Sequence, residues 1–195
     1  MDDEILMVIA EKDYGSTRGI KTTDRDFLHG RWIHLINYDW AVEGFGQWET
    51  DEFDNLTSRV LAGGGGRYSV AQRRDVYSFA LGLGAFHETE KQNLVSYQDT
   101  NELWRMNSYY TYNYQINDNV KVANTAYYQP SLSDFNDFRV LFDAGISVKI
   151  STRLQLQVNY RLTHDSEPAQ NLLVSPPIDN HKTNTEYATS LVYSF

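Results

Sequence analysis

The stretch His164-Asp165-Ser166-Glu167 is the sharpest candidate for catalytic chemistry in the sequence. A histidine two residues from a serine can act as the base that activates the serine hydroxyl as a nucleophile. The same stretch also fits a turn, because Glu167 precedes Pro168 and the residue before a proline is pushed out of helical geometry. We favour a strand end that enters a polar link, and we keep a His164–Ser166 catalytic pair as the alternative.

Metal chemistry has weaker support in the sequence. The five histidines show neither the H-x-H nor the H-E-x-x-H spacing, and the chain has no cysteine. We therefore expect no metal site, no cofactor and no thiolate catalysis. Clustered carboxylates could supply the oxygen ligands of Ca²⁺ or Mg²⁺, but they follow no EF-hand pattern, so solvated charge is the favoured interpretation. These carboxylates are Glu49, Asp51, Glu52, Asp54, Asp99, Glu102, Asp134 and Asp137.

Composition narrows the class of protein and its partners. The 195 residues carry a net charge of -9 with a pI of about 4.9, so nucleic acid is a poor partner. Apolar residues make up 41% of the chain, and no run approaches the roughly 18 apolar residues of a membrane helix. The first residues, MDDEILMVIA, lack the basic region of a signal peptide, so we expect any export signal to have been removed.

The elements that position the candidate residues are strands. Period-two alternation runs through the chain, and helical periodicity is nearly absent. From Leu154 to Leu162, for example, apolar residues alternate with Gln155, Gln157, Asn159 and Arg161. The expected strands are long compared with the soluble average of about five or six residues, whereas a tilted membrane strand needs about 9–11. We expect ten strands, at 5–14, 26–37, 40–49, 56–70, 76–88, 102–116, 120–130, 138–150, 154–165 and 183–195.

The links between these strands alternate in length. Short turns are expected at 36–40, 68–77, 116–120 and 150–154, and longer polar links at 13–26, 49–56, 88–102, 130–138 and 165–183. Outer-membrane barrels alternate short periplasmic turns with long external loops, and a sandwich has no reason to do so. The sequence therefore predicts a single all-β domain over 1–195, an up-and-down antiparallel transmembrane β-barrel. An even strand count is expected to close it, with both termini periplasmic.

The polar face of each strand would then point into the barrel lumen. Charges in a narrow lumen must be paired, so we expect a ladder of ion pairs between neighbouring strands. Ten strands lie near the size at which side chains fill the interior, because aqueous channels need about 16. Phe45, Tyr109 and Leu141 would reduce the space further, and a largely filled lumen is favoured over a conducting one. The expected ladder comprises Glu43, Arg59, Arg67, Arg105, Arg139, Asp143, Lys149, Arg161 and Glu186.

The glycine run 63–66 lies inside the fourth expected strand. It lacks the following Lys-Ser/Thr of a phosphate-binding loop. Glycine within a strand more often marks a bend or a close approach by a neighbour. With Gly82 and Gly84 of the next strand, we expect a smooth patch against which interior aromatic rings pack.

Several segments match a known pattern in register and order. The stretch from Gly30 to Tyr68 reads GRWIHLINYDWAVEGFGQWETDEFDNLTSRVLAGGGGRY, and YQPSLSDFNDFRVLFDAGISVKIS, YRLTHDSEP and the closing LVYSF follow it. Over about 26–195 the chain resembles the YdiY-like family of salt-induced outer membrane proteins, domain of unknown function 481. The resemblance implies an outer-membrane β-barrel of unsettled role. Family members carry more strand-like sequence at the N-terminus, so a twelve-stranded parent is the alternative to ten strands.

Two features of the C-terminal region bear on an outer-membrane location. The final strand ends on Tyr193 and Phe195, which resembles the terminal signal read by the barrel-assembly machinery. His164-x-Ser166 also resembles the motif of lipid A deacylases, which leaves a lipid-modifying enzyme as an alternative.

We expect a non-enzymatic protein with a structural or interaction role. Its expected partners are outer-membrane lipid and lipopolysaccharide, the assembly machinery and other envelope proteins. Two further alternatives are a narrow pore for ions or small solutes and a soluble barrel whose apolar faces turn inward around a ligand.

Overall fold

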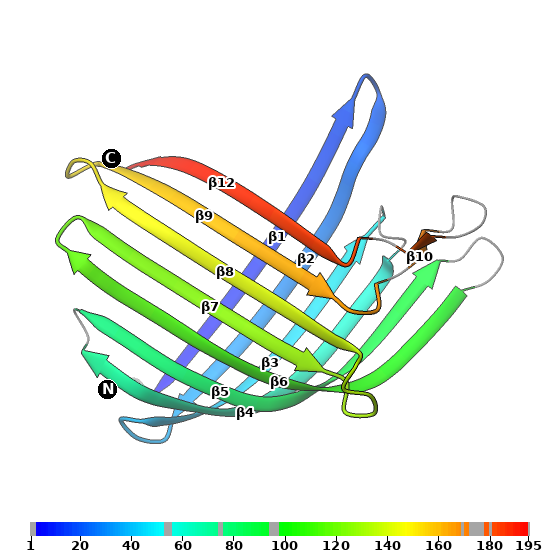
Figure 1. Ribbon diagram of the computed structural model, residues 1–195, viewed down its shortest axis with the longest axis horizontal. Helices are drawn as coiled ribbons and strands as arrows, with labels where there is room; N and C mark the ends of the chain where they lie inside the picture. The colour runs from blue at the N-terminus through cyan, green and yellow to red at the C-terminus, as the bar shows by residue number, and fades with distance from the viewer. Residues whose placement is uncertain are drawn as a thin grey trace.

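One antiparallel sheet of ten strands makes up the structure (Figure 1). The computed structural model describes residues 3–52, 56–73, 76–93, 98–168, 170–171, 178–179 and 181–194. Each strand pairs with the next along the chain, in the order β1-β2-β3-β4-β5-β6-β7-β8-β9-β12. The strands are β1 (Glu4–Thr17), β2 (Ile20–Leu35), β3 (Trp40–Asp51), β4 (Leu56–Arg73), β5 (Tyr77–Asn93), β6 (Gln98–Asn117), β7 (Val120–Pro130), β8 (Phe138–Lys149), β9 (Leu154–Asp165) and β12 (Thr183–Tyr193). The pair β10 (Gln170–Asn171) and β11 (Ile178–Asp179) forms a separate small hairpin in the last long link.

All ten predicted strands are confirmed, but the link predicted at 13–26 was wrong. β1 and β2 run on through this range and meet at a tight turn of Arg18 and Gly19, whose φ angles are 54° and 79°. Positive φ at both central residues is the geometry of a type I′ hairpin turn. The link at 88–102 is also shorter than predicted, because β5 continues to Asn93 and β6 begins at Gln98. The regular alternation of link lengths is therefore weaker than the sequence suggested.

The β1–β2 hairpin extends past the ends of the neighbouring strands, as Figure 1 shows. Its extension carries charges on the side that is apolar elsewhere: Lys12 Nζ lies 2.8 Å from Asp26 Oδ1, and Lys21 Nζ lies 2.8 Å from Asp24 Oδ2. The ammonium groups of Lys21 and Lys12 lower the pKa of the Asp24 carboxyl below its ordinary value. In this part of β1 and β2, paired charges stand where the other strands have apolar residues. For this reason the sequence pattern predicted a link here instead of two strands.

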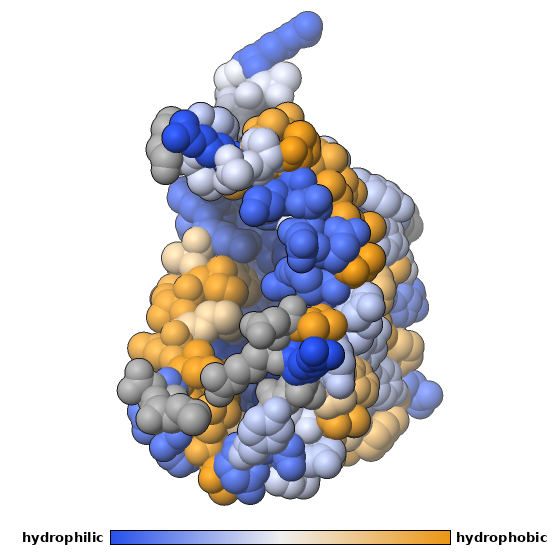
Figure 2. All heavy atoms as spheres, turned by 90° about the vertical axis from the view of Figure 1, so that its left-hand side faces the viewer, coloured by the Kyte–Doolittle hydropathy of each residue, from blue (hydrophilic) through white to orange (hydrophobic). Residues whose placement is uncertain are grey.

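The two faces of the sheet differ in polarity. Among the described residues, side chains from strands that are not neighbours in the sheet meet on one face: Tyr109 of β6 contacts Glu43 of β3, and Arg139 of β8 contacts Glu88 of β5. This face is therefore concave, and it carries the polar and charged residues. Exposed large apolar residues such as Leu6, Leu83 and Val158 occupy the convex face. In Figure 2, hydrophilic residues line the recess and hydrophobic residues gather on the outer flanks. A soluble barrel with its apolar faces inward is excluded by this arrangement.

Glycines allow β4 and β5 to curve around the interior. Gly63 pairs with Phe86, and a Cβ at Gly63 would meet the backbone oxygen of Ala85. The ring of Tyr109 lies across Gly82, in the space that a Cβ at Gly82 would occupy. The expected packing of an interior aromatic ring on the glycine patch is therefore present. Phe45 and Phe86 add a second ring contact nearby, with centroids 6.2 Å apart.

The sheet is an open half-barrel, so the predicted closure by an even strand count was wrong for the described residues. β1 and β12 are its two edges and do not pair with each other. An even count makes the first and last strands antiparallel, but closure also needs strand number, tilt and stagger to agree. Both chain ends lie at the short-turn end of the sheet (Figure 1). Among the described residues, no helix is long and apolar enough to cross a membrane.

Because β4 and β5 approach each other closely at Gly63, alanine substitutions at Gly63 and Gly66 of β4 should differ in their effect on stability. We expect Gly63→Ala to destabilise the fold by about 1–3 kcal/mol, because the new methyl group must displace backbone atoms. Gly66→Ala is the control, since a Cβ at Gly66 meets nothing within 4 Å. Urea unfolding measures both. Equal stability of the two variants would contradict the close approach.

Candidate functional site

The concave wall carries a connected network of buried charge near the long-link end of the strands. Glu88, at 2% exposure, is its centre. Its carboxylate lies 2.6 Å from Arg139 Nη1, 3.4 Å from Arg105 Nε and 3.7 Å from Arg59 Nε. Glu90 lies two residues further along β5 and accepts hydrogen bonds from Arg59 Nη2 at 2.7 Å and Arg139 Nη2 at 3.2 Å. Two carboxylates of one strand therefore hold guanidinium groups from β4, β6 and β8.

The network extends across the wall in both directions. Toward β2, Arg25 Nη2 lies 2.8 Å from Glu49, and Glu49 lies 3.4 Å from Arg59. Toward β9, Arg139 Nε donates to Asp165 Oδ2 at 2.8 Å. The nine members carry five carboxylates against four guanidinium groups. They are Arg25, Glu49, Arg59, Glu88, Glu90, Arg105, Asp137, Arg139 and Asp165.

Arg105 ties the link after β7 to the same network. Its Nη2 lies 3.0 Å from both carboxylate oxygens of Asp137, and its Nη1 donates to the backbone oxygen of Asp137 at 3.4 Å. Arg105 is 3% exposed and Ser131, at the start of the link, is 1% exposed. A hydrogen bond between an arginine and a carboxylate is charge-assisted and roughly twice as strong as a neutral one. The link over 131–137 is therefore held against the wall.

A second cluster fills the interior closer to the short turns. Tyr109 Oη donates to Glu43 Oε1 at 2.7 Å, and Arg31 Nη2 donates to Tyr127 Oη at 3.2 Å. The Arg31 guanidinium also lies over the rings of Phe45 and Tyr109, 5.7 Å and 5.6 Å from their centroids. Both hydrogen bonds join β2 and β3 to β6 and β7, so they cross the concave space. This part of the interior is occupied by large side chains.

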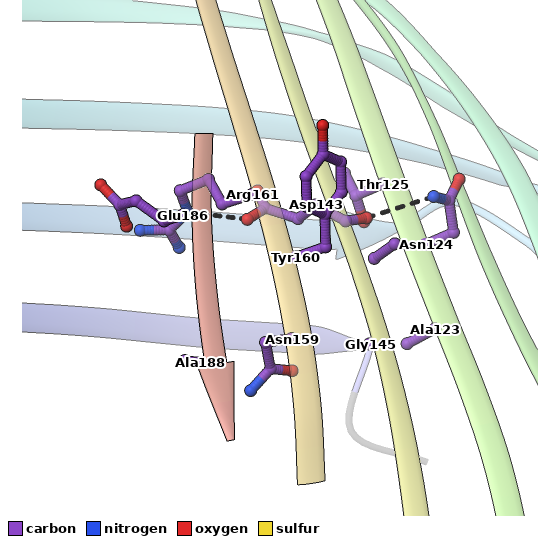
Figure 3. Close-up of a pocket in the computed structure, with 11 residues that line it drawn as sticks. Ala123, Asn124, Thr125, Asp143, Gly145, Asn159, Tyr160, Arg161, Glu186 and Ala188 are labelled. Carbon is purple, nitrogen blue, oxygen red and sulfur yellow. Dashed lines mark hydrogen bonds and ion pairs between the residues drawn. The ribbon is translucent and has the colours of Figure 1, made fainter. Parts of the chain in front are cut away.

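The wall formed by β7, β8, β9 and β12 is open by comparison. A hollow of about 370 Å³ lies along it (Figure 3). Ala123, Gly145 and Ala188 contribute small side chains or none. Arg161 Nε donates to Asp143 Oδ1 at 2.7 Å, and both side chains of this pair are close to half exposed.

All nine residues of the predicted charge ladder lie on the concave face by strand register. The structure brings Arg59, Arg105 and Arg139 together at Glu88, pairs Asp143 with Arg161, and places Glu186 opposite Arg161. Glu43 belongs to the separate cluster with Tyr109. Among the described residues, Arg67 and Lys149 form no ion pair within 4 Å.

Sequence reasoning missed most of the acidic half of the network. Glu88 and Glu90 fell at the start of a predicted link. The prediction of solvated charge at Glu49 and Asp137 was wrong, because both are buried and paired with arginines. The available signal was the alternation of side chains along a strand. Glu88 and Glu90 lie two and four positions after Phe86, so they point to the same inward face of β5. The loop carboxylate Asp137 could not be recognised in this way, since its place depends on Arg105.

His164 and Ser166, the candidate catalytic pair, each form a hydrogen bond with a different residue. His164 lies on the convex face, where its Nδ1 is 2.8 Å from Thr183 Oγ1. Ser166 Oγ accepts a hydrogen bond from the Phe138 backbone N–H at 2.7 Å. Lipid-modifying chemistry at this pair stays a prediction. In the part of the chain that the structure describes, no three His, Cys, Asp or Glu side chains are grouped to hold a metal ion.

The proposed assembly signal is only partly described. Tyr193 ends β12 on the convex face with 52% exposure. Phe195 lies outside the described residues.

Comparison with known proteins agrees with the resemblance noted in the sequence. The family described as "Protein of unknown function, DUF481" matches residues 2–195. No curated protein matches the chain. Among solved structures, one titled "NanC porin structure in rhombohedral crystal form" is similar with a TM-score of 0.58 and 11% identity, covering 98% of this chain and 93% of that chain. At this identity the similarity shows the fold alone.

The network predicts unequal costs for two carboxylates of the concave wall. Glu88→Gln should destabilise the folded state by about 3 kcal/mol, because buried guanidinium groups lose a charged partner. Asp143→Asn should cost less than about 1 kcal/mol, because its pair with Arg161 is solvated. Urea unfolding measures both, and equal costs would contradict the central place of Glu88.

Proposed function

Because the chain belongs to the DUF481 family and has a porin-like β-barrel fold, we propose that it is an outer-membrane protein of a Gram-negative bacterium. Its convex face contacts lipid, including lipopolysaccharide, and its concave face lines a polar interior. The short turns and both termini lie on the periplasmic side. The barrel-assembly machinery inserts it, and the chain has a structural or interaction role rather than an enzymatic one.

The single observation that carries this proposal is the segregation of side chains by face. The convex face exposes apolar residues along its strands, and the concave face holds the ionic networks. Water would not favour a broad exposed apolar surface, whereas a bilayer requires one. Aromatic residues add to this pattern, since Trp40 and Tyr68 lie toward the short turns and Trp48 and Trp104 toward the long links, all exposed. Such residues are enriched where a membrane meets water.

A narrow passage for small solutes is the second candidate function. The hollow along β7 to β12 favours it, since polar residues and small side chains line it. Large side chains occupy the interior between β2 and β7, where the Arg31 and Glu43 cluster lies, and this supports the structural role. The two candidates therefore concern different parts of the same interior.

The assignment of faces predicts opposite outcomes at two alanines of β7. Ala126 lies on the convex face and Ala123 lines the hollow. Ala126→Arg should destabilise folding into lipid vesicles by about 2–4 kcal/mol, because the charge enters the hydrocarbon. Ala123→Arg is the matched control and should cost much less, because its charge stays in the polar interior.

Two measurements show whether the purified chain and its variants have folded. Heat-modifiable migration on a gel and sheet-rich circular dichroism should require detergent or lipid. A folded, monodisperse protein in plain buffer would overturn the proposal, and so would tolerance of Ala126→Arg together with loss of folding in Ala123→Arg.

A further inference from the structure

The interior of the sheet is unevenly occupied. Between β2 and β7, side chains such as Arg31, Tyr109 and Phe86 fill the concave space, and Phe86 is 1% exposed. Along β7 to β12, the hollow is lined at inward positions by the small residues Ala123, Gly145 and Ala188. Small side chains at inward positions therefore leave space along this wall.

Charge in this space is uneven too. Arg161 is paired with Asp143 at 2.7 Å and lies opposite Glu186 of β12 (Figure 3). Glu11, on the inward face of β1, is near enough to act on Arg161 electrostatically. Asp143, Glu186 and Glu11 thus bring three negative charges to the neighbourhood of one guanidinium group, and Arg161 can balance only one of them.

Basic residues elsewhere on this wall lie too far away to balance the hollow. Lys149 is six positions from Asp143 along β8, about 20 Å at the rise of a strand. Lys121 pairs with Ser147, four positions from Asp143, which is about 13 Å. Arg139 lies four positions from Asp143 on the other side, also about 13 Å, and is already paired with Glu88, Glu90 and Asp165. Charges further apart than about 10 Å are largely screened at 0.1 M salt. The local excess of carboxylate therefore sets the potential in the hollow.

We propose that the water-filled path through this protein runs along the β7–β12 wall, and that Asp143, Arg161 and Glu186 make it selective for small cations over anions. Neutral solutes that form hydrogen bonds would also fit, since Thr125 and Asn159 offer polar groups at the same place. This inference rests on the proposed narrow passage and adds its course and its preferred solute.

The course of the path can be tested by chemical labelling, because the chain has no native cysteine. Ala188→Cys and Ala123→Cys place a thiol in the hollow. Ala80→Cys, at a position 3% exposed on the inward face of β5, is the matched control in the filled part. In lipid vesicles, a charged methanethiosulfonate should modify the first two thiols and spare the third. The opposite pattern would place the path elsewhere and overturn the inference.

The preference for cations is tested in planar bilayers with a potassium chloride gradient. The unmodified protein should give a reversal potential of cation-selective sign. Glu186→Gln should shift that potential toward zero, and Arg161→Gln should shift it further in the cationic direction. Glu102→Gln is the control, because it removes the same charge from an exposed site at the other face of the sheet.

The outcomes separate this inference from the proposal on which it rests. No conductance above the lipid baseline would remove the passage itself. Conductance with anion selectivity, or with a reversal potential that neither Glu186→Gln nor Arg161→Gln changes, would keep a passage and overturn its assignment to this wall. Heat-modifiable migration of each variant confirms that it has folded.

Discussion

The structure depends on the constraint that buried charge must be paired. In a low-dielectric interior an isolated charge is costly, and removal of one partner leaves the other uncompensated. Glu88 meets this constraint with arginines from three strands, and those arginines continue to Glu49, Asp137 and Asp165. The ionic network joins strands that make no backbone contact with one another. It therefore ties distant parts of the concave face together and sets the charge of its wall.

Side-chain alternation predicted the fold well because it is a local property. The series Val140, Phe142 and Ala144 faces one side of β8, and the strand pairing follows directly from such series. Strand ends were harder to predict. Lys12 and Asp26 form an ion pair on the convex side of the β1–β2 hairpin, so the apolar signal stops before the strand does.

The candidate site was predicted from its basic residues more than from its acidic ones. Arg59, Arg105 and Arg139 lie within clear alternating stretches, whereas Glu88 and Glu90 stand where the alternation gives way to polar sequence. No local pattern could show that Asp137 meets Arg105, because 32 positions separate them and a link intervenes. The sequence also could not predict that the sheet stays open, because closure depends on the combined geometry of all ten strands.

If the convex face lies in lipid, the four native tryptophans report on that contact directly. Trp32, Trp40, Trp48 and Trp104 all lie on that face, each more than a third exposed. Fluorescence of the folded protein should be strongly quenched in vesicles whose acyl chains carry bromine, and little affected by aqueous iodide. Strong quenching by iodide with no response to brominated lipid would contradict the account.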